Sequence, residues 1–261
     1  MTGLFRKKKK EFIINEPKRE WIDSAFVWLY YTFNWDLIKK NKVLVPNYED
    51  FPIVYNEERD CIEKTLRIVA TQMGVSPDDI HLDIYNEGQT EISIGGTRRL
   101  FLNNVEGENY SSGLYWGKQN DGKYHIGLEI SESRDPEKIV AILAHEIAHI
   151  KLLGEEKIEK NIETLTDLTT VIFGLGIFNA NAAFKFEQDT DYWRYSKVGY
   201  LTQMEWAYSL ALFAYLKQEK APNWINYLTP NIKSDFIKSE RFISENKEII
   251  LRLDLEQKGS C

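Results

Sequence analysis

The chain has 261 residues, of which 43% are hydrophobic and 28% charged, and this length can bury the core of one domain or of two small ones. Its formal net charge of −7 argues against nucleic acid as a partner, because phosphate binding requires a basic face. Only two cysteines are present, Cys61 and Cys261, which excludes a disulfide framework and suits a reducing cytoplasm.

The first sixteen residues predict a flexible basic tail. They include four consecutive lysines, Lys7–Lys10, but no apolar stretch of the kind found in signal peptides follows. The longest apolar run, residues 171–184, contains two glycines and two asparagines and is too short to span a bilayer. We therefore expect a cytoplasmic protein without a membrane span. Its single domain covers residues 17–253, and a second flexible tail covers residues 254–261.

Two helices are predicted before residue 75. The first covers residues 17–33, where Pro17 suits a first helical turn and apolar side chains share one face. A short extended piece near residues 42–47 follows. The second helix covers residues 57–73 and ends at Gly74, which can adopt the left-handed conformation that terminates helices.

The apolar period changes between residues 80 and 130, where alternation is typical of strands. It predicts four strands, at residues 80–85, 90–94, 113–118 and 123–130. Asp121-Gly122 between the last two is a good signal for a hairpin turn. The sheet is therefore predicted to be small, and mixed or antiparallel, with its last hairpin immediately before a helix.

That helix is predicted to begin at Asp135-Pro136-Glu137, which combines an N-cap acid, a proline in the first helical position and a further acid. It runs to about Leu153. Another helix follows, and the rest of the chain is mainly helical, with predicted helices at residues 163–173, 201–217 and 234–251. The order of helices, a small sheet and more helices predicts an α+β fold.

The motif that carries chemistry is His145-Glu146-Ile-Ala-His149, inside the predicted helix. Histidines four residues apart project from one face of a helix, so their nitrogens can converge on one ion. Glu146 is spaced to act as a base on a metal-bound water and not as a ligand. The other two histidines, His81 and His125, lie in strand-like runs without partners, and we interpret them as structural.

Zinc needs a third protein ligand and keeps its fourth position open in a catalytic site. Glu163 and Asp167 lie four residues apart on the next predicted helix and therefore share one face. Burying two acids on an otherwise apolar helix would be costly without a cation. A zinc ion and the ring N–H of a ligating histidine would relieve that cost. The alternative is that both acids are ordinary solvated residues.

His-Glu-x-x-His followed by Glu-x-x-x-Asp resembles the gluzincin metallopeptidases over about residues 135–175. The resemblance implies a zincin-like fold with an active-site helix and a glutamate helix. It implies one zinc ion held by His145, His149 and Glu163, with Glu146 as the general base. Asp167 would then accept a hydrogen bond from His145 and orient it.

The spacing departs from this family in one respect. Thirteen residues separate His149 from Glu163, fewer than in most gluzincins, so Asp167 could coordinate instead, as the third acid does in aspzincins. A wider stretch, residues 152–181, resembles uncharacterised bacterial proteins and implies no activity.

The resemblance implies a zinc-dependent peptidase, in which a zinc-activated water attacks a peptide bond with Glu146 as general base. The strand near Ser112–Lys118 would pair with an extended peptide or protein substrate. An additional donor should stabilise the oxyanion, and the candidates are Arg194, Tyr195 and Tyr200.

Two other functions are open on the sequence. The same site could hydrolyse a non-peptide amide such as a formyl group, although Cys61 lies in no recognisable deformylase motif. The helix pair could also be a non-catalytic, metal-stabilised or metal-free scaffold that binds a partner protein. The presence of Glu146 argues against a scaffold, because a structural zinc has no use for a base.

Overall fold

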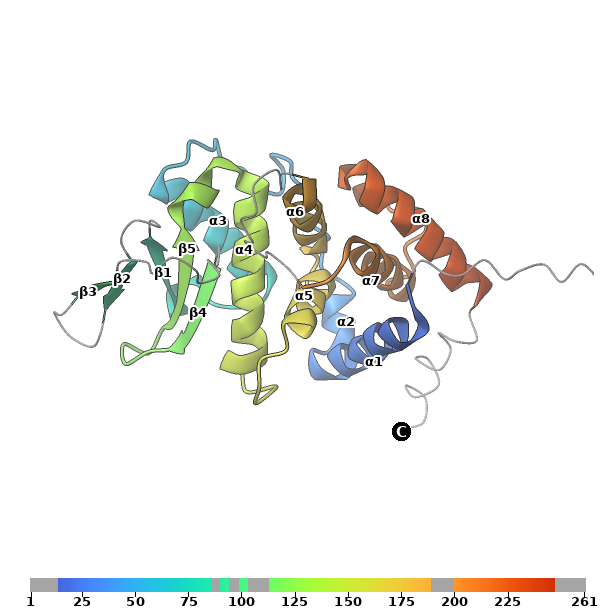
Figure 1. Cartoon of the computed structure of the whole chain (residues 1–261), viewed down its shortest axis with the longest axis horizontal. Coiled ribbons are helices and arrows are strands. Elements are labelled where there is room, and N and C mark those ends of the chain that lie inside the picture. The colour runs from blue at the N-terminus through green and yellow to red at the C-terminus, as the bar shows by residue number, and fades with distance from the viewer. Residues whose placement is uncertain (1–13, 86–89, 94–98, 103–112, 189–199, 247–261) are drawn as a thin grey trace, which may run out of the picture.

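The structure is a computed structural model, and it describes residues 14–85, 90–93, 99–102, 113–188 and 200–246 (Figure 1). This part of the chain has the predicted α+β composition. Its elements are α1 (Glu16–Thr32), α2 (Trp35–Ile38), α3 (Arg59–Gln72), η1 (Pro77–Asp79), β1 (Ile80–Tyr85), β2 (Thr90–Ser93), β3 (Arg99–Leu102), β4 (Gly113–Lys118), β5 (Tyr124–Glu129), η2 (Ile130–Arg134), α4 (Pro136–His149), η3 (Ile150–Gly154), α5 (Glu163–Ile172), α6 (Gly176–Gln188), α7 (Gln203–Leu216), η4 (Asn223–Tyr227) and α8 (Pro230–Glu245).

The main sheet is mixed, and its strand order is β1-β5-β4. The central strand β5 pairs in parallel with β1 and antiparallel with β4, and a β-bulge lies between Tyr115 and Gly117. The predicted hairpin between β4 and β5 is confirmed, with Gly122 at a φ of +80° in its turn. The strands β2 and β3 form a separate antiparallel pair, of which the sequence predicted only the first.

The helix ends follow local signals. The side chain of Asp135 accepts hydrogen bonds from the backbone N–H groups of Glu137 and Lys138, so it caps α4 as predicted. Asn15 caps α1 in the same way, and Ile14 is only 6% exposed. Residues 14–16, which the sequence assigned to a basic tail, therefore belong to the described fold.

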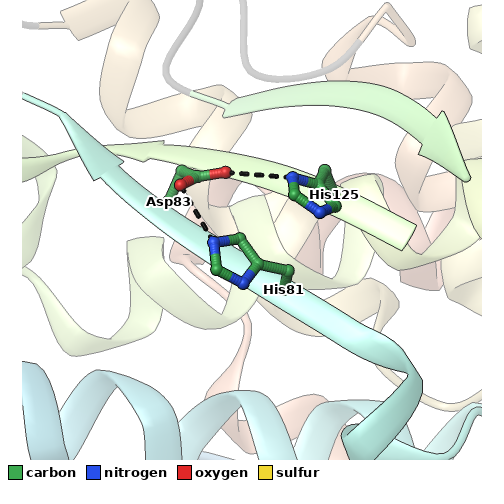
Figure 2. A group of neighbouring side chains, drawn as sticks. All are labelled: His81, Asp83 and His125. Atoms are coloured by element: carbon green, nitrogen blue, oxygen red, sulfur yellow. Dashed lines mark hydrogen bonds and ion pairs between the residues drawn. The ribbon is translucent and has the colours of Figure 1, made fainter. Parts of the chain in front are cut away.

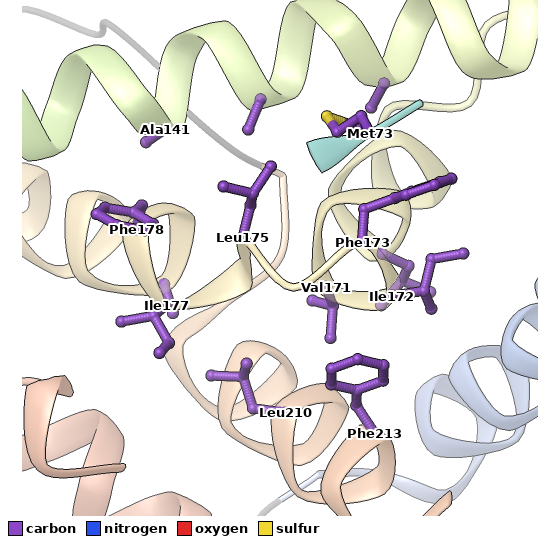
Figure 3. Packing of buried hydrophobic residues seen from close by; sticks show 14 of the residues in the cluster. Met73, Ala141, Val171, Ile172, Phe173, Leu175, Ile177, Phe178, Leu210 and Phe213 are labelled. Carbon is purple, nitrogen blue, oxygen red and sulfur yellow. The ribbon is translucent and has the colours of Figure 1, made fainter. Parts of the chain in front are cut away.

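Helix α4 lies at the centre of the molecule, between the sheet on one side and α5 and α6 on the other (Figure 1). Every residue from 139 to 149 is buried, as expected of a helix that is covered on all sides. Figure 3 shows side chains of α6 and of the loop before it, among them Leu175 and Phe178, packed between α4 and α7. The sequence indicated this region only as an apolar run and did not delimit α6.

Two glycines, Gly174 and Gly176, allow close packing before and at the start of α6. Gly174 has a φ of +81°, and a Cβ there would lie 2.6 Å from the carbonyl oxygen of Lys42. A Cβ on Gly176 would lie 2.8 Å from Val171. No helix in the described ranges is both long and apolar enough to cross a membrane.

Candidate metal centre

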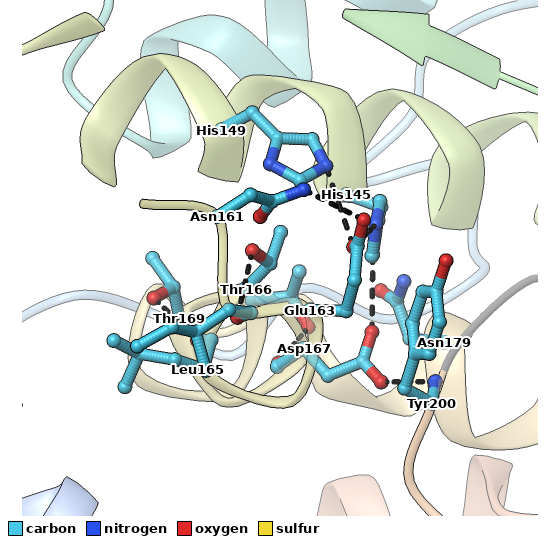
Figure 4. Close-up of polar contacts among 12 residues, drawn as sticks. His145, His149, Asn161, Glu163, Leu165, Thr166, Asp167, Thr169, Asn179 and Tyr200 are labelled. Carbon is cyan, nitrogen blue, oxygen red and sulfur yellow. Dashed lines mark hydrogen bonds and ion pairs between the residues drawn. The ribbon is translucent and has the colours of Figure 1, made fainter. Parts of the chain in front are cut away.

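Three atoms suited to bind a metal converge between α4 and α5 (Figure 4). Glu163 Oε2 lies 3.1 Å from His145 Nε2 and 3.6 Å from His149 Nε2. The two imidazole rings are nearly perpendicular, at an interplanar angle of 85°. A tetrahedral zinc ion with bonds near 2.0–2.1 Å separates its ligand atoms by about 3.3–3.4 Å. The two separations from Glu163 therefore bracket the value that one shared ion requires, and all the ligand atoms of the group lie within 4.8 Å of one another.

Asp167 lies next to this group but faces the other side of the His145 ring. Its Oδ1 accepts a hydrogen bond of 3.0 Å from His145 Nδ1, and its side chain is fully buried. Its Oδ2 accepts hydrogen bonds from the backbone N–H groups of Tyr200, at 2.6 Å, and Leu201, at 3.0 Å. Both carboxylate oxygens are thus engaged, and Asp167 fixes the His145 ring with Nε2 directed towards Glu163.

His149 is held by packing and not by hydrogen bonds. It is 5% exposed, and its ring stacks on Tyr115 at a centroid distance of 5.6 Å. Its Nδ1 has no hydrogen-bond partner among the described residues, and its Nε2 is too far from Glu163 for a good hydrogen bond. A buried imidazole with so little polar contact is costly. A cation bound at Nε2 would give this ring one strong polar contact, so the residues present fit a metal ion.

The charges of the group depend on one another. Burial lowers the pKa of His145, but hydrogen bonds with Asp167 and Glu163 outweigh it and raise this pKa to about 10. Burial and the charge of His145 lower the pKa of His149, so that ring is neutral. Burial raises the pKa of Glu163, but its contacts with the histidines lower it further than burial raises it. His145 must therefore lose a proton before its Nε2 can bind a metal.

Glu146 is buried beside the three candidate ligand atoms, but its carboxylate does not belong to that group. Burial raises the pKa of its carboxyl group to about 7, which suits a group that accepts and returns a proton near neutral pH. Its carboxylate contacts the first residue of β4, because a Cβ on Gly113 would lie 2.5 Å from Glu146 Oε1. Only glycine allows this approach, and no pattern in the sequence indicated it.

Two further side chains border the group. Asn161 donates a hydrogen bond of 2.7 Å to Glu163 Oε1, and sequence reasoning did not identify it. Tyr200, one of the predicted oxyanion donors, has its ring 6.3 Å from that of His145 and is 44% exposed. Burial and neighbouring acids raise the pKa of Tyr200, so its hydroxyl keeps its proton. The other two predicted donors, Arg194 and Tyr195, lie outside the described residues.

The remaining residues considered in the sequence lie elsewhere. Cys61 is buried on α3, where its thiol donates to Asn56 Oδ1 at 2.9 Å, and it is not part of the group. The interpretation of His81 and His125 as residues without partners is wrong, because their rings stack on each other at 4.4 Å. They lie on opposite strands, 44 residues apart, and only the pairing of β1 with β5 brings them together.

Comparison with protein-family models, with curated proteins and with solved structures found no match to this chain. The resemblance to gluzincins therefore rests on the residues of the sequence motif alone.

Proposed function

We propose that the protein is a zinc-dependent hydrolase that cleaves peptide bonds. The observation that carries this proposal is the convergence of His145 Nε2, His149 Nε2 and Glu163 Oε2 at separations suited to one ion. Glu163 is the proposed third ligand, because Asp167 already uses both oxygens in hydrogen bonds. Three protein ligands would leave a bound zinc ion accessible to water or substrate, as catalysis requires.

A bound zinc ion would polarise a carbonyl group and make a water molecule more acidic. Glu146 would take the proton from that water and later return it to the leaving nitrogen. The raised pKa of Glu146, about 7, keeps both transfers close to balance at neutral pH. Tyr200, which keeps its proton, would donate a hydrogen bond to the oxygen that develops negative charge.

The position of β4 supports a peptide as the substrate. This strand forms an edge of the described sheet, and its first residue, Gly113, lies against Glu146. An extended peptide that paired with an edge strand by backbone hydrogen bonds would pass along this carboxylate. A deformylase-like site would need Cys61 as a ligand. The thiol of Cys61 instead donates a hydrogen bond to Asn56, which argues against a formyl amide as the substrate.

The test combines metal analysis with a peptide-library digest followed by mass spectrometry. We expect about one zinc per chain in the buried site and cleavage by the wild-type protein. Glu146→Gln should retain the metal and lose at least about 1,000-fold in turnover, because it lacks the base. Glu137→Gln, in the first turn of the same helix, is the matched control and should remain active. Full activity of Glu146→Gln would overturn the mechanism.

A further inference from the structure

A second group of side chains of the kinds that can hold a metal ion lies on β1 and β5 (Figure 2). His81 and His125 are directly opposite each other in the parallel pair of β1 and β5. Their neighbours Leu82 and Ile126 are buried in the core, so by strand alternation the two imidazoles project from the opposite face. The sheet therefore separates this group from the candidate metal centre.

Asp83 connects the two rings. Its Oδ1 lies 3.2 Å from His81 Nε2, and its Oδ2 lies 3.5 Å from His125 Nδ1. Two imidazoles and a carboxylate form a donor set suited to zinc and to other divalent transition metals, which imidazole ligands prefer. All the histidines of the chain thus lie in one of two groups that each pair two imidazoles with a carboxylate.

A fourth side chain sets which nitrogen of His125 is free to bind. Asp121 Oδ2 lies 2.9 Å from His125 Nε2 and accepts its proton in a hydrogen bond. The lone pair of His125 is then on Nδ1, the nitrogen that faces Asp83. A carboxylate that holds the second nitrogen of a ligating histidine is the usual outer contact of a metal site.

The ligand atoms need a small rearrangement to share an ion. They lie within 4.8 Å of one another, whereas tetrahedral zinc brings its ligand atoms to about 3.3–3.4 Å. The rings are stacked at an interplanar angle of 24° and must rotate so that each plane contains the ion. The side chains of His81 and Asp83 are 47% and 44% exposed, so both have room to turn.

We propose that His81, Asp83 and His125 bind a second divalent transition-metal ion, with Asp121 orienting His125. The ion would join β1 to β5 on the outer face of the sheet. Its affinity is lower than that of the buried centre, because exposed side chains lose conformational entropy when they become ordered. The proposal is independent of the peptidase function, since it uses none of the same residues.

The experiment is a zinc titration of the full-length protein against a chromophoric chelator, repeated with cobalt(II) as a spectroscopic probe. We expect two zinc ions per wild-type chain, the second bound more weakly. The double variant His81→Ala/His125→Ala should lose the second ion, with at least a 100-fold fall in that affinity, and keep the first. Asp121→Asn should keep both ions but weaken the second by about 10–100-fold. Asp60→Asn, an exposed acid on α3, is the control and should change neither.

Urea unfolding in the presence of a chelator checks that the double variant is folded. We expect it to fold, because the side chain of His81 is 47% exposed and that of His125 is 21% exposed. An unchanged zinc stoichiometry in a folded double variant would overturn the inference. So would a wild-type protein whose single zinc disappears in His149→Ala. Conversely, a single zinc that disappears only in the double variant would support the surface site and refute the proposed peptidase.

Discussion

Replacing Asp167 with asparagine exchanges one carboxylate oxygen for an NH2 group at a point where three hydrogen bonds converge. One oxygen of Asp167 accepts from His145 Nδ1, and the other accepts from the backbone N–H groups of Tyr200 and Leu201. The side chain is fully buried, so water cannot replace a lost contact. Asparagine is nearly the same size, and the change therefore tests hydrogen bonding and charge alone.

The asparagine oxygen can face only one of its two sets of donors. We expect it to face the two backbone N–H groups, because the opposite orientation would lose two hydrogen bonds instead of one. The NH2 group then donates to His145 Nδ1, which moves the ring proton to Nε2, the atom proposed to bind zinc. Losing this orienting contact should weaken zinc binding by about 10–100-fold. Losing the charged hydrogen bond should lower the free energy of unfolding by about 1.5–3 kcal/mol.

Zinc affinity is measured by competition with a chromophoric chelator, and the free energy of unfolding by urea denaturation in the presence of a chelator. The matched control is Thr169→Val on the same helix. The hydroxyl of Thr169 is buried and donates to the carbonyl oxygen of Leu165, at 2.8 Å, away from the metal centre. This variant should lose about 1 kcal/mol of stability and keep its zinc affinity.

The reasoning would be refuted by an Asp167→Asn protein that loses stability but binds zinc within twofold of the wild type. Asp167 would then only anchor the backbone at Tyr200 and Leu201, and the orientation of His145 would have another cause.

Three other features of the structure can be tested in solution. Zinc binding should release one proton from His145, so the apparent zinc affinity should rise about tenfold per pH unit between pH 7.5 and 8.5. This window lies below the His145 pKa of about 10 and above the Glu146 pKa of about 7. A chelator competition that shows no pH dependence would contradict this. Gly113→Ala places a Cβ 2.5 Å from Glu146 Oε1 and should reduce turnover by about 100-fold at unchanged zinc content. Full activity of this variant would contradict the prediction. Tyr208→Phe removes a buried hydrogen bond of 2.6 Å to Asp23 and should cost about 1–3 kcal/mol in urea unfolding, and a loss below about 0.5 kcal/mol would show that Asp23 finds another donor.

The sequence alone predicted the features that depend on neighbours along the chain. The spacing of His145 and His149 places both rings on one face of a helix whatever surrounds it. Asp135 caps that helix through the two N–H groups next to it, and Gly122 allows the hairpin turn at a positive φ. These signals span five residues or fewer, so they specify the elements and the pair of histidines without any tertiary contact.

Only the tertiary structure decided how distant parts meet. Glu163 and Asp167 share one face of α5. The rotation of α5 about its axis, relative to α4, places Glu163 near both Nε2 atoms and Asp167 at Nδ1 of His145. His81 meets His125 because β1 pairs in parallel with β5, a register that no local pattern encodes. Strand partners and helix rotations are set by packing of the whole core, whereas periodicity specifies only which side chains share a face.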